Sequence, residues 1–192
     1  MTGTRAAETA ARKKRLIVAA TALAAEGGYD AVQMRDVAAR AEVALGTLYR
    51  HYASKDQLLL AAMAQQASTL RDRLVQRPPD GETPAARVSD VLKRASRALA
   101  RAPLVTKAML TAMSSSEAAT VPLKHDIDST LRAIIADVVD GDGRCKTYAD
   151  LDAIVRVLGS VWFAELTYWS NGLHASTSIG DNLASAAHLL LG

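Results

Sequence analysis

Aromatic residues and cysteines are scarce in this chain. Only 4% of its residues are aromatic, and it has one cysteine, Cys145, among 192 residues. A single cysteine cannot form a disulfide within the chain, and it cannot build a cysteine-based metal site. No run of alternating β-branched residues bounded by turns occurs, so we expect no strands.

Long apolar runs and enzyme signatures are also missing. No apolar stretch reaches the length of about 20 residues that a membrane-spanning helix requires, and the basic N-terminus is unlike a signal peptide. We therefore expect a cytoplasmic protein without a membrane partner. Nucleophile-elbow, zincin, P-loop and dinucleotide-binding motifs are absent, and the four histidines are scattered. The sequence predicts no catalytic residues, no metal and no cofactor, and hence not an enzyme.

Helix-forming residues with apolar side chains at helical spacing make up most of the chain. Apolar residues account for 49% of it, which is enough to bury a sizeable core. We predict an all-α fold with a three-helix head at 1–54 and a larger helical bundle at 55–192. Helices are expected over about residues 8–26, 34–41, 45–52, 55–76, 84–99, 103–113, 123–138, 148–170 and 179–191.

The segment GGYDAVQMRDVAARAEVALGTLYRHYASKDQLLL, residues 27–60, is typical of a helix-turn-helix. Two adjacent glycines end the first helix, and Val43 is the apolar residue of the turn between the next two. Leu48 and Tyr52, four residues apart, face the core. The opposite side of that helix is then free to enter a DNA groove. The alternative is a purely structural helical hairpin that binds nothing.

Short and polar side chains occupy the free side of the helix that begins at Leu45. Gly46 lets the backbone approach DNA, Thr47 suits a base edge or a thymine methyl, and Arg50 suits guanine or phosphate. Lys55, at the start of the following helix, suits a phosphate. The predicted DNA-contact residues are Arg35, Leu45, Gly46, Thr47, Tyr49, Arg50, His51 and Lys55.

The positive charge is concentrated near the N-terminus. The chain carries a net charge of +3, and the excess of basic over acidic residues falls within 1–60. The first fifteen positions hold Arg5, Arg12, Lys13, Lys14 and Arg15. Such a segment is either a solubilising, frayed terminus or a contact for a polyanion, and the neighbouring motif favours DNA.

Large, soft side chains in the C-terminal part suit a cavity for a bulky apolar ligand. The alternative for each of them is ordinary core packing. Glu165 interrupts one apolar stripe, and we expect it to face solvent near an interface, because an unpaired buried carboxylate is costly. The predicted ligand-binding residues are Met109, Met113, Trp162, Phe163, Leu166 and Trp169.

The pattern A-x-V-x-x-G-T-L-Y-R-H-Y-x-S-K-x-x-L-L, which begins at Ala41, resembles the TetR family of bacterial transcriptional repressors. The resemblance covers about residues 10–60 and implies nine helices, a homodimer, a ligand cavity in the C-terminal domain and the DNA contacts named above. Two positions depart from the family. Glu42 stands where glycine is frequent, and Ala44 stands where a capping serine or threonine is frequent.

Within the family, residues 27–50 and the segment RAPLVTKAM are most similar to repressors of cholesterol and sterol catabolism, which respond to acyl-CoA thioesters. The expected partners are palindromic double-stranded operator DNA, an apolar or acyl-CoA-like effector that releases it, and a second copy of the chain. The last two helices would form the dimer interface, with Leu183, Leu190 and Leu191 supplying apolar area. The alternative is a helical lipid- or small-molecule-binding protein with no DNA-binding role.

Overall fold

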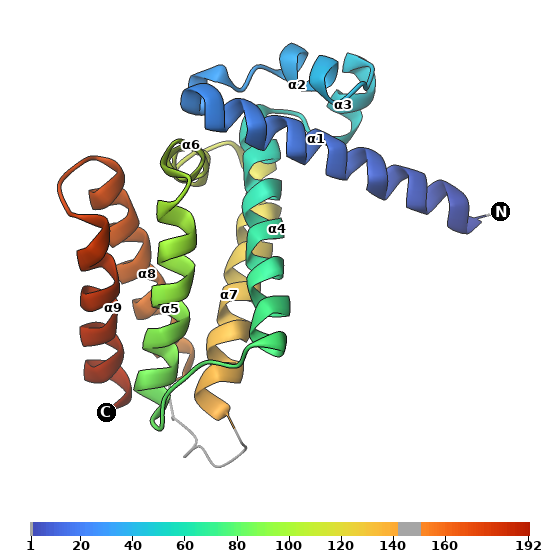
Figure 1. Cartoon of the computed structure of the whole chain (residues 1–192). Coiled ribbons are helices and arrows are strands. Elements are labelled where there is room, and N and C mark those ends of the chain that lie inside the picture. The colour runs from blue at the N-terminus through green and yellow to red at the C-terminus, as the bar shows by residue number, and fades with distance from the viewer. Residues whose placement is uncertain (1, 142–150) are drawn as a thin grey trace. The chain divides into compact units, whose positions relative to one another are not determined.

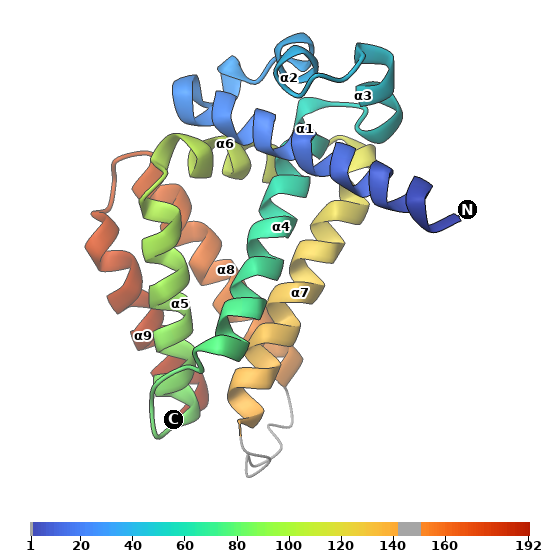
Figure 2. The ribbon, with the colours of Figure 1, turned by 45° about the vertical axis from the view of Figure 1, so that its right-hand side comes forward.

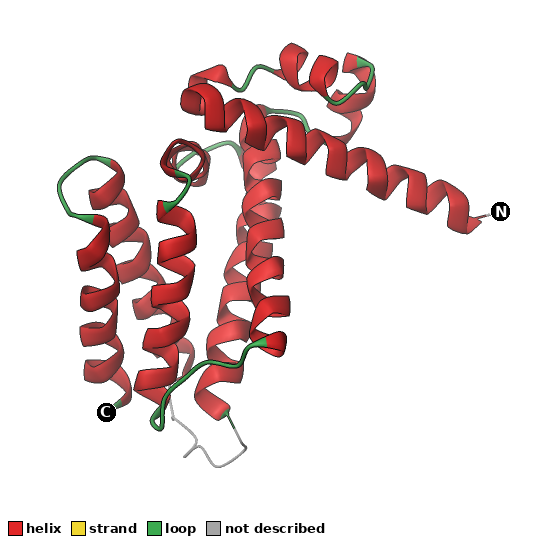
Figure 3. Cartoon of the chain, viewed as in Figure 1, coloured by secondary structure: helices red, strands yellow, loops and turns green. Residues whose placement is uncertain are grey.

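The computed structural model describes residues 2–141 and 151–192, and over these residues it holds helices and no strand (Figure 3). The all-α prediction is confirmed. Cys145 and the predicted helix start at Tyr148 lie outside the described residues. The helices are α1 (Thr2–Ala31), α2 (Met34–Arg40), α3 (Leu45–His51), α4 (Lys55–Gln76), α5 (Pro84–Ala100), α6 (Pro103–Met113), the short 3-10 helix η1 (Ala118–Thr120), α7 (Val121–Asp140), α8 (Leu151–Ser170) and α9 (Ser176–Leu191).

The chain forms two compact units. The first, here called the head unit, comprises residues 1–65 and 102–126, and the second, the bundle unit, comprises residues 66–101 and 127–192. The head unit therefore contains α6 and the α6–α7 linker in addition to the predicted head. The division of functions at residue 54 stays a prediction.

The head unit is built around α1, which packs against α2 and α6 (Figures 1 and 2). Leu16, Ala20 and Ala24 follow one another at helical spacing, and each is fully buried. The helical path is interrupted at Gly27 and at Gly28, whose φ of 70° lies in the left-handed region. Glycine enters that region without a steric penalty, so the predicted break after residue 26 is confirmed.

The two helices of the helix-turn-helix are short and weakly capped. Each has seven residues, and neither Gln33 before α2 nor Ala44 before α3 makes a side-chain capping hydrogen bond. Helices of this length are not stable alone in water. Their stability comes from packing, since Val37 and Leu48 are completely buried.

In the bundle unit, α9 packs against both α5 and α8 (Figure 1). The start of α5 is well defined, because the Thr83 side chain accepts a hydrogen bond from the amide of Ala86 at 3.1 Å. Leu183 is fully buried and Leu191 is 6% exposed, so both pack inside their own unit. The expectation that these two leucines supply an interface with another copy is wrong. Leu189, which is 87% exposed, is the large apolar residue that α9 presents to solvent.

A buried hydrogen bond joins α8 to α5. The indole nitrogen of Trp162 donates to Oγ of Ser96 at 3.0 Å, and both residues are buried. The hydroxyl of the other buried α5 serine, Ser89, instead donates to the carbonyl of Ala85 within the same helix. Removing the Ser96 hydroxyl therefore leaves the buried indole N–H of Trp162 without an acceptor, whereas removing the Ser89 hydroxyl leaves no buried donor unpaired.

We expect Ser96→Ala to lower the free energy of unfolding by about 1–3 kcal/mol, because it leaves the buried indole N–H of Trp162 without an acceptor. Urea unfolding followed by tryptophan fluorescence measures the loss. Ser89→Ala is the matched control, and it should stay within about 0.5 kcal/mol of the parent because only the serine's own hydroxyl bond is removed. Equal effects of the two substitutions would contradict this role for Ser96.

Glu165 does not face solvent, contrary to the prediction. It is 8% exposed, and its carboxylate Oε2 lies 3.0 Å from Nδ1 of His174. The ring of Tyr168 meets the His174 ring edge-on with the centroids 5.0 Å apart. The expected cost of a buried carboxylate is offset because the imidazole provides a hydrogen-bonding partner.

Candidate DNA-binding site

One side of α3 is buried and the other is open, as predicted. Leu48 is 0% exposed and Tyr52 is 7% exposed, whereas Tyr49 is 50% exposed. Gly46 is also exposed, and a Cβ atom built on it would meet no atom within 4 Å. The backbone at the start of α3 is thus accessible to a large partner.

The polar groups on the open side of α3 are arranged together. Nη2 of Arg50 donates to Oγ1 of Thr47 at 3.2 Å, one helical turn earlier. Arg50 is exposed, while Leu45 and Thr47 are half-buried. Arg35 is exposed on α2. Thr47 and Arg50 therefore share one accessible side of α3, with a cation and a hydroxyl placed side by side.

The turn before α3 carries local strain. Glu42 has φ of 53°, and it is the residue other than glycine that has a positive φ in the described part of the chain. Side chains with a Cβ enter this left-handed region at a cost. The turn is closed by the Val43 amide, which donates to the carbonyl of Ala38 at 2.9 Å. The position where the family often has glycine is thus one where the backbone favours it.

Lys55 is held by Tyr29 at the start of α4. Its Nζ donates to the Tyr29 carbonyl at 3.2 Å and lies 3.8 Å from the centre of the Tyr29 ring. The Tyr29 hydroxyl donates to Oδ1 of Asp56 at 2.6 Å. Burial, followed by the hydrogen bond and charge of Asp56, raises the pKa of Tyr29 to about 12. The ammonium predicted to meet a phosphate is therefore already fixed in position within the head unit.

We expect Tyr29→Phe to lower the free energy of unfolding by about 1 kcal/mol at pH 8, the usual value for one lost hydrogen bond. The raised pKa of Tyr29 means that folding favours its neutral form. This contribution is present below pH 10, the ordinary pKa, and is lost as the pH rises through about 12. Denaturation of both proteins between pH 8 and pH 12 should show the difference shrinking, and a difference that grows with pH would contradict the assignment.

The start of α4 is also tied to the α6–α7 linker. Oγ of Ser54 donates to Oε2 of Glu117 at 2.6 Å, and Nε2 of Gln57 donates to the Ala119 carbonyl at 2.6 Å. The amide oxygen of the same side chain, Oε1 of Gln57, accepts a hydrogen bond from the backbone amide of Ala53. The Ser54-x-x-Gln57 spacing of a capping box was available in the sequence. No local pattern pointed to Glu117, which lies 63 residues from Ser54.

His51, at the end of α3, holds a polar atom without a partner. Its Nε2 is buried and makes no hydrogen bond to the described residues. Burial, followed by the nearby charges of Lys13, Arg50 and Arg12, lowers the pKa of His51. His51 is therefore less accessible than the sequence suggested, and it lies close to basic residues of α1.

The predicted ligand-binding residues fall into different surroundings. Trp162 and Leu166 are buried on α8, whereas Phe163 on the same helix is 37% exposed. Trp169 is half-buried near the end of α8. Met109 and Met113 belong to α6 in the head unit, where the first is buried and the second half-buried. Their joint role in binding a ligand stays a prediction.

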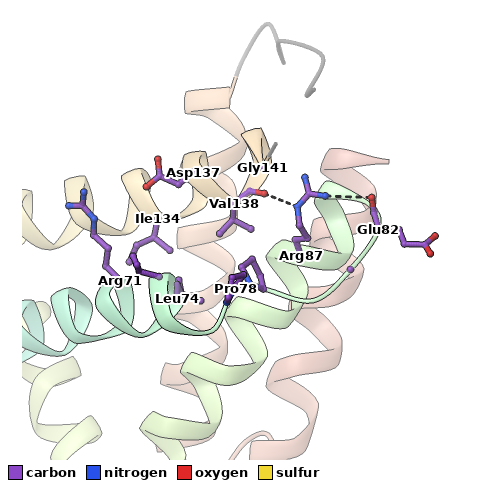
Figure 4. Close-up of a pocket in the computed structure, with 12 residues that line it drawn as sticks. Arg71, Leu74, Pro78, Glu82, Arg87, Ile134, Asp137, Val138 and Gly141 are labelled. Carbon is purple, nitrogen blue, oxygen red and sulfur yellow. Dashed lines mark hydrogen bonds between the residues drawn. The ribbon is translucent and has the colours of Figure 1, made fainter. Parts of the chain in front are cut away.

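A pocket of about 640 Å³ lies elsewhere in the bundle unit, where α4 and α7 end (Figure 4). Leu74, Ile134 and Val138 contribute apolar surface to it, and Arg71 is exposed at its edge. Arg87 also lines it, but its guanidinium donates to the carbonyls of Val138 and Val139 at 3.0 and 3.2 Å, respectively. None of the six predicted ligand-binding residues lines this pocket.

Comparison with known proteins decides which kind of helix-turn-helix protein this is. Residues 16–62 match the family described as bacterial regulatory proteins, tetR family, and residues 81–190 match the tetracyclin repressor-like C-terminal domain. The chain belongs to the TetR family. It is a transcriptional repressor whose head unit carries the family's DNA-binding helix-turn-helix.

Individual relatives of this TetR repressor agree with the sequence resemblance. The transcriptional repressor KstR of Rhodococcus jostii is 35% identical over 94% of this chain and 83% of its own length. A TetR regulator from Rhodococcus sp. RHA1 is 34% identical, with a TM-score of 0.86 over 96% of this chain and 97% of that one. Thermus thermophilus FadR, solved with lauroyl-CoA, shares the fold at 20% identity, with a TM-score of 0.73 over 93% of both chains.

The described part of the chain holds neither a membrane-spanning helix nor a cluster of metal ligands. Within residues 2–141 and 151–192, no helix has the length and apolar character to cross a membrane. Over the same part of the chain, no group of three or more histidine, cysteine, aspartate or glutamate residues could hold a metal ion. The relatives are transcriptional regulators.

Proposed function

We propose that this TetR repressor binds a palindromic operator as a homodimer and is released from it by an apolar or acyl-CoA-like effector. The observation that carries the proposal is the open side of α3, where Gly46, Thr47 and Arg50 are accessible above a buried Leu48. A twofold dimer would place two such helices about 34 Å apart, one DNA turn, and so match a palindrome.

Exposed apolar residues on α8 and α9 support dimerisation through these helices. Val157 and Tyr168 are 45% and 44% exposed on α8, together with Phe163, and Leu189 is 87% exposed on α9. Val157 and Tyr168 are eleven residues, or about three turns, apart and so share one face of α8. An apolar face left exposed in this way suits coverage by another subunit. The four residues replace the buried Leu183 and Leu191 as the proposed interface.

The effector class is supported by the relatives. KstR is a repressor of this family at 33–35% identity, and the segments quoted from the sequence resemble regulators that respond to sterol-derived acyl-CoA thioesters. FadR of Thermus thermophilus holds lauroyl-CoA on the same fold. An effector of this class combines a bulky apolar body with anionic phosphates, and the apolar residues Trp162 and Leu166 of the bundle unit are proposed to receive the apolar part.

Release of DNA requires that the effector bind the DNA-incompetent conformation more tightly than the competent one. The contacts within the head unit offer a route for this preference. A shift of α6 would move its linker, and the Glu117 carboxylate in that linker is bonded to Ser54 at the start of α4. The α4 residue Lys55 is one of the proposed phosphate contacts, so displacement of the linker would disturb the DNA-binding side.

Binding to the DNA that flanks its own gene tests the proposal. Thr47→Ala should lower the ratio of operator to non-specific affinity roughly tenfold, because a base contact is lost, and Lys55→Ala should weaken both and reduce the salt slope by about 1. Fluorescence anisotropy at several salt concentrations measures these quantities. Equal affinity of the parent protein for flanking and scrambled DNA would overturn the proposal, and a retained apolar ligand in that case would favour the small-molecule-binding alternative.

A further inference from the structure

The long helix α1 carries basic residues on the same face as the apolar residues that it buries in the head unit. The core residues Leu16, Ala20 and Ala24 are spaced by four along α1. Continued toward the N-terminus, the same face of the helix reaches Arg12, four residues before Leu16, and then Arg5, seven residues earlier still. The face of α1 that is apolar where it packs in the head unit therefore becomes cationic beyond it.

The structure shows a helix here, not a frayed end. α1 is helical from Thr2, and its N-terminal part extends past α3 in both views of the molecule (Figures 1 and 2). Arg5 is exposed and Arg12 is half-buried. Neither of them makes an ion pair with an acidic residue in the described part of the chain. The helical backbone of α1 thus carries cations that form no ion pair with the described residues.

The basic stripe of α1 adjoins the recognition helix. The charges of Lys13, Arg50 and Arg12 all act on His51 at the end of α3. Its Nε2 atom is buried and makes no hydrogen bond to the described residues, and the charges that act on His51 are all positive. Arg12, Lys13 and Arg50 therefore lie near one another around His51, and Arg5 follows Arg12 on the same face of α1. These four residues are here called the α1–α3 basic strip.

We propose that the α1–α3 basic strip binds the sugar-phosphate backbone of DNA next to the groove that α3 enters. The inference rests on the proposed DNA-binding role of α3, because Arg50 belongs both to the strip and to the predicted base-reading side. Arginine and lysine bind phosphate through charge-assisted hydrogen bonds and release condensed counterions. Such contacts fix orientation and add affinity, but they carry no sequence information.

Two double variants test the α1–α3 basic strip, and each of them removes two positive charges from the protein. Arg5→Gln/Arg12→Gln removes two cations of the strip. Lys14→Gln/Arg73→Gln is the control, because Lys14 lies about 200° around α1 from Arg12 and Arg73 is an exposed residue of α4 in the bundle unit. The first variant should lower the slope of log K against log salt by about 2 and weaken binding roughly tenfold, equally on operator and non-specific DNA. The second should remain within about twofold of the parent.

The outcomes separate the strip from the proposed function. If the parent protein binds its operator and the two variants lose equal affinity, only net charge matters and the strip is wrong. A selective loss on the operator alone would also overturn it, because backbone contacts act on every sequence. If the parent protein does not bind operator DNA, the proposed function itself fails. Circular dichroism and urea unfolding of both variants verify that α1 remains folded.

Discussion

Leu48→Ala is expected to lower the free energy of unfolding of the head unit by about 2–5 kcal/mol, because Leu48 is completely buried and alanine leaves a cavity. The loss is large beside the 5–15 kcal/mol that stabilises typical domains. α3 has seven residues and no side-chain cap, so packing of Leu48 is its main support. Operator affinity should therefore fall by about 30-fold or more, since each 1.4 kcal/mol needed to order α3 for binding costs tenfold in affinity.

Two control substitutions separate packing from other effects of the change. Leu48→Met conserves most of the volume and should cost less than about 1.5 kcal/mol, with operator binding retained. Leu173→Ala removes a side chain that is 70% exposed and lies outside the proposed interface, so it should leave the stability of the chain nearly unchanged. Urea unfolding and a gel shift on the same preparations measure both effects. Full operator binding by Leu48→Ala would show that α3 does not depend on this residue.

Glu42→Gly is expected to raise both stability and DNA affinity. A side chain at φ of 53° costs roughly 1–2 kcal/mol, whereas glycine loses about 0.4–1 kcal/mol more conformational entropy on folding. The relief of strain is the larger of the two, so a net gain of about 0.5–1 kcal/mol should remain. The substitution also removes an acidic group beside the proposed duplex, which should increase the salt slope by about 1.

The two effects of Glu42 can be measured apart. Glu42→Gln removes the charge but keeps the Cβ, so DNA affinity should rise while stability stays unchanged. Glu42→Asn should gain on both counts, because asparagine tolerates the left-handed region better than most residues. Thermal unfolding and anisotropy titrations provide the measurements. A Glu42→Gly protein that is less stable than the parent would refute the assignment of strain to this turn.

Local chemistry explains which features of the fold were predictable. The break at Gly27 and Gly28 and the start of α5 at Thr83 and Pro84 follow from backbone freedom and capping, which depend on adjacent residues. The inward direction of Leu48 followed from helical spacing alone. The family pattern supplied the function of this segment, and the comparisons confirm it.

Features that depend on distant partners were missed. The burial of Glu165 is possible only because His174, after the end of α8, returns to meet it. The bond between Ser54 and Glu117 joins segments that share no sequence pattern. The extension of α1 to Thr2 had a different cause, because its first residues carry no capping signal although alanine favours a helix throughout.

The packing of α6 against α1 limits how the DNA-binding part can be separated from the rest. A fragment that ended at residue 65 would lose α6 and the linker that holds Ser54. The uncovered side of α1 would then meet water, and such a fragment should self-associate or unfold. A stable minimal DNA-binding fragment would need residues 102–126 linked to residues 1–65. The smallest fragment expected to fold on its own is therefore discontinuous in sequence.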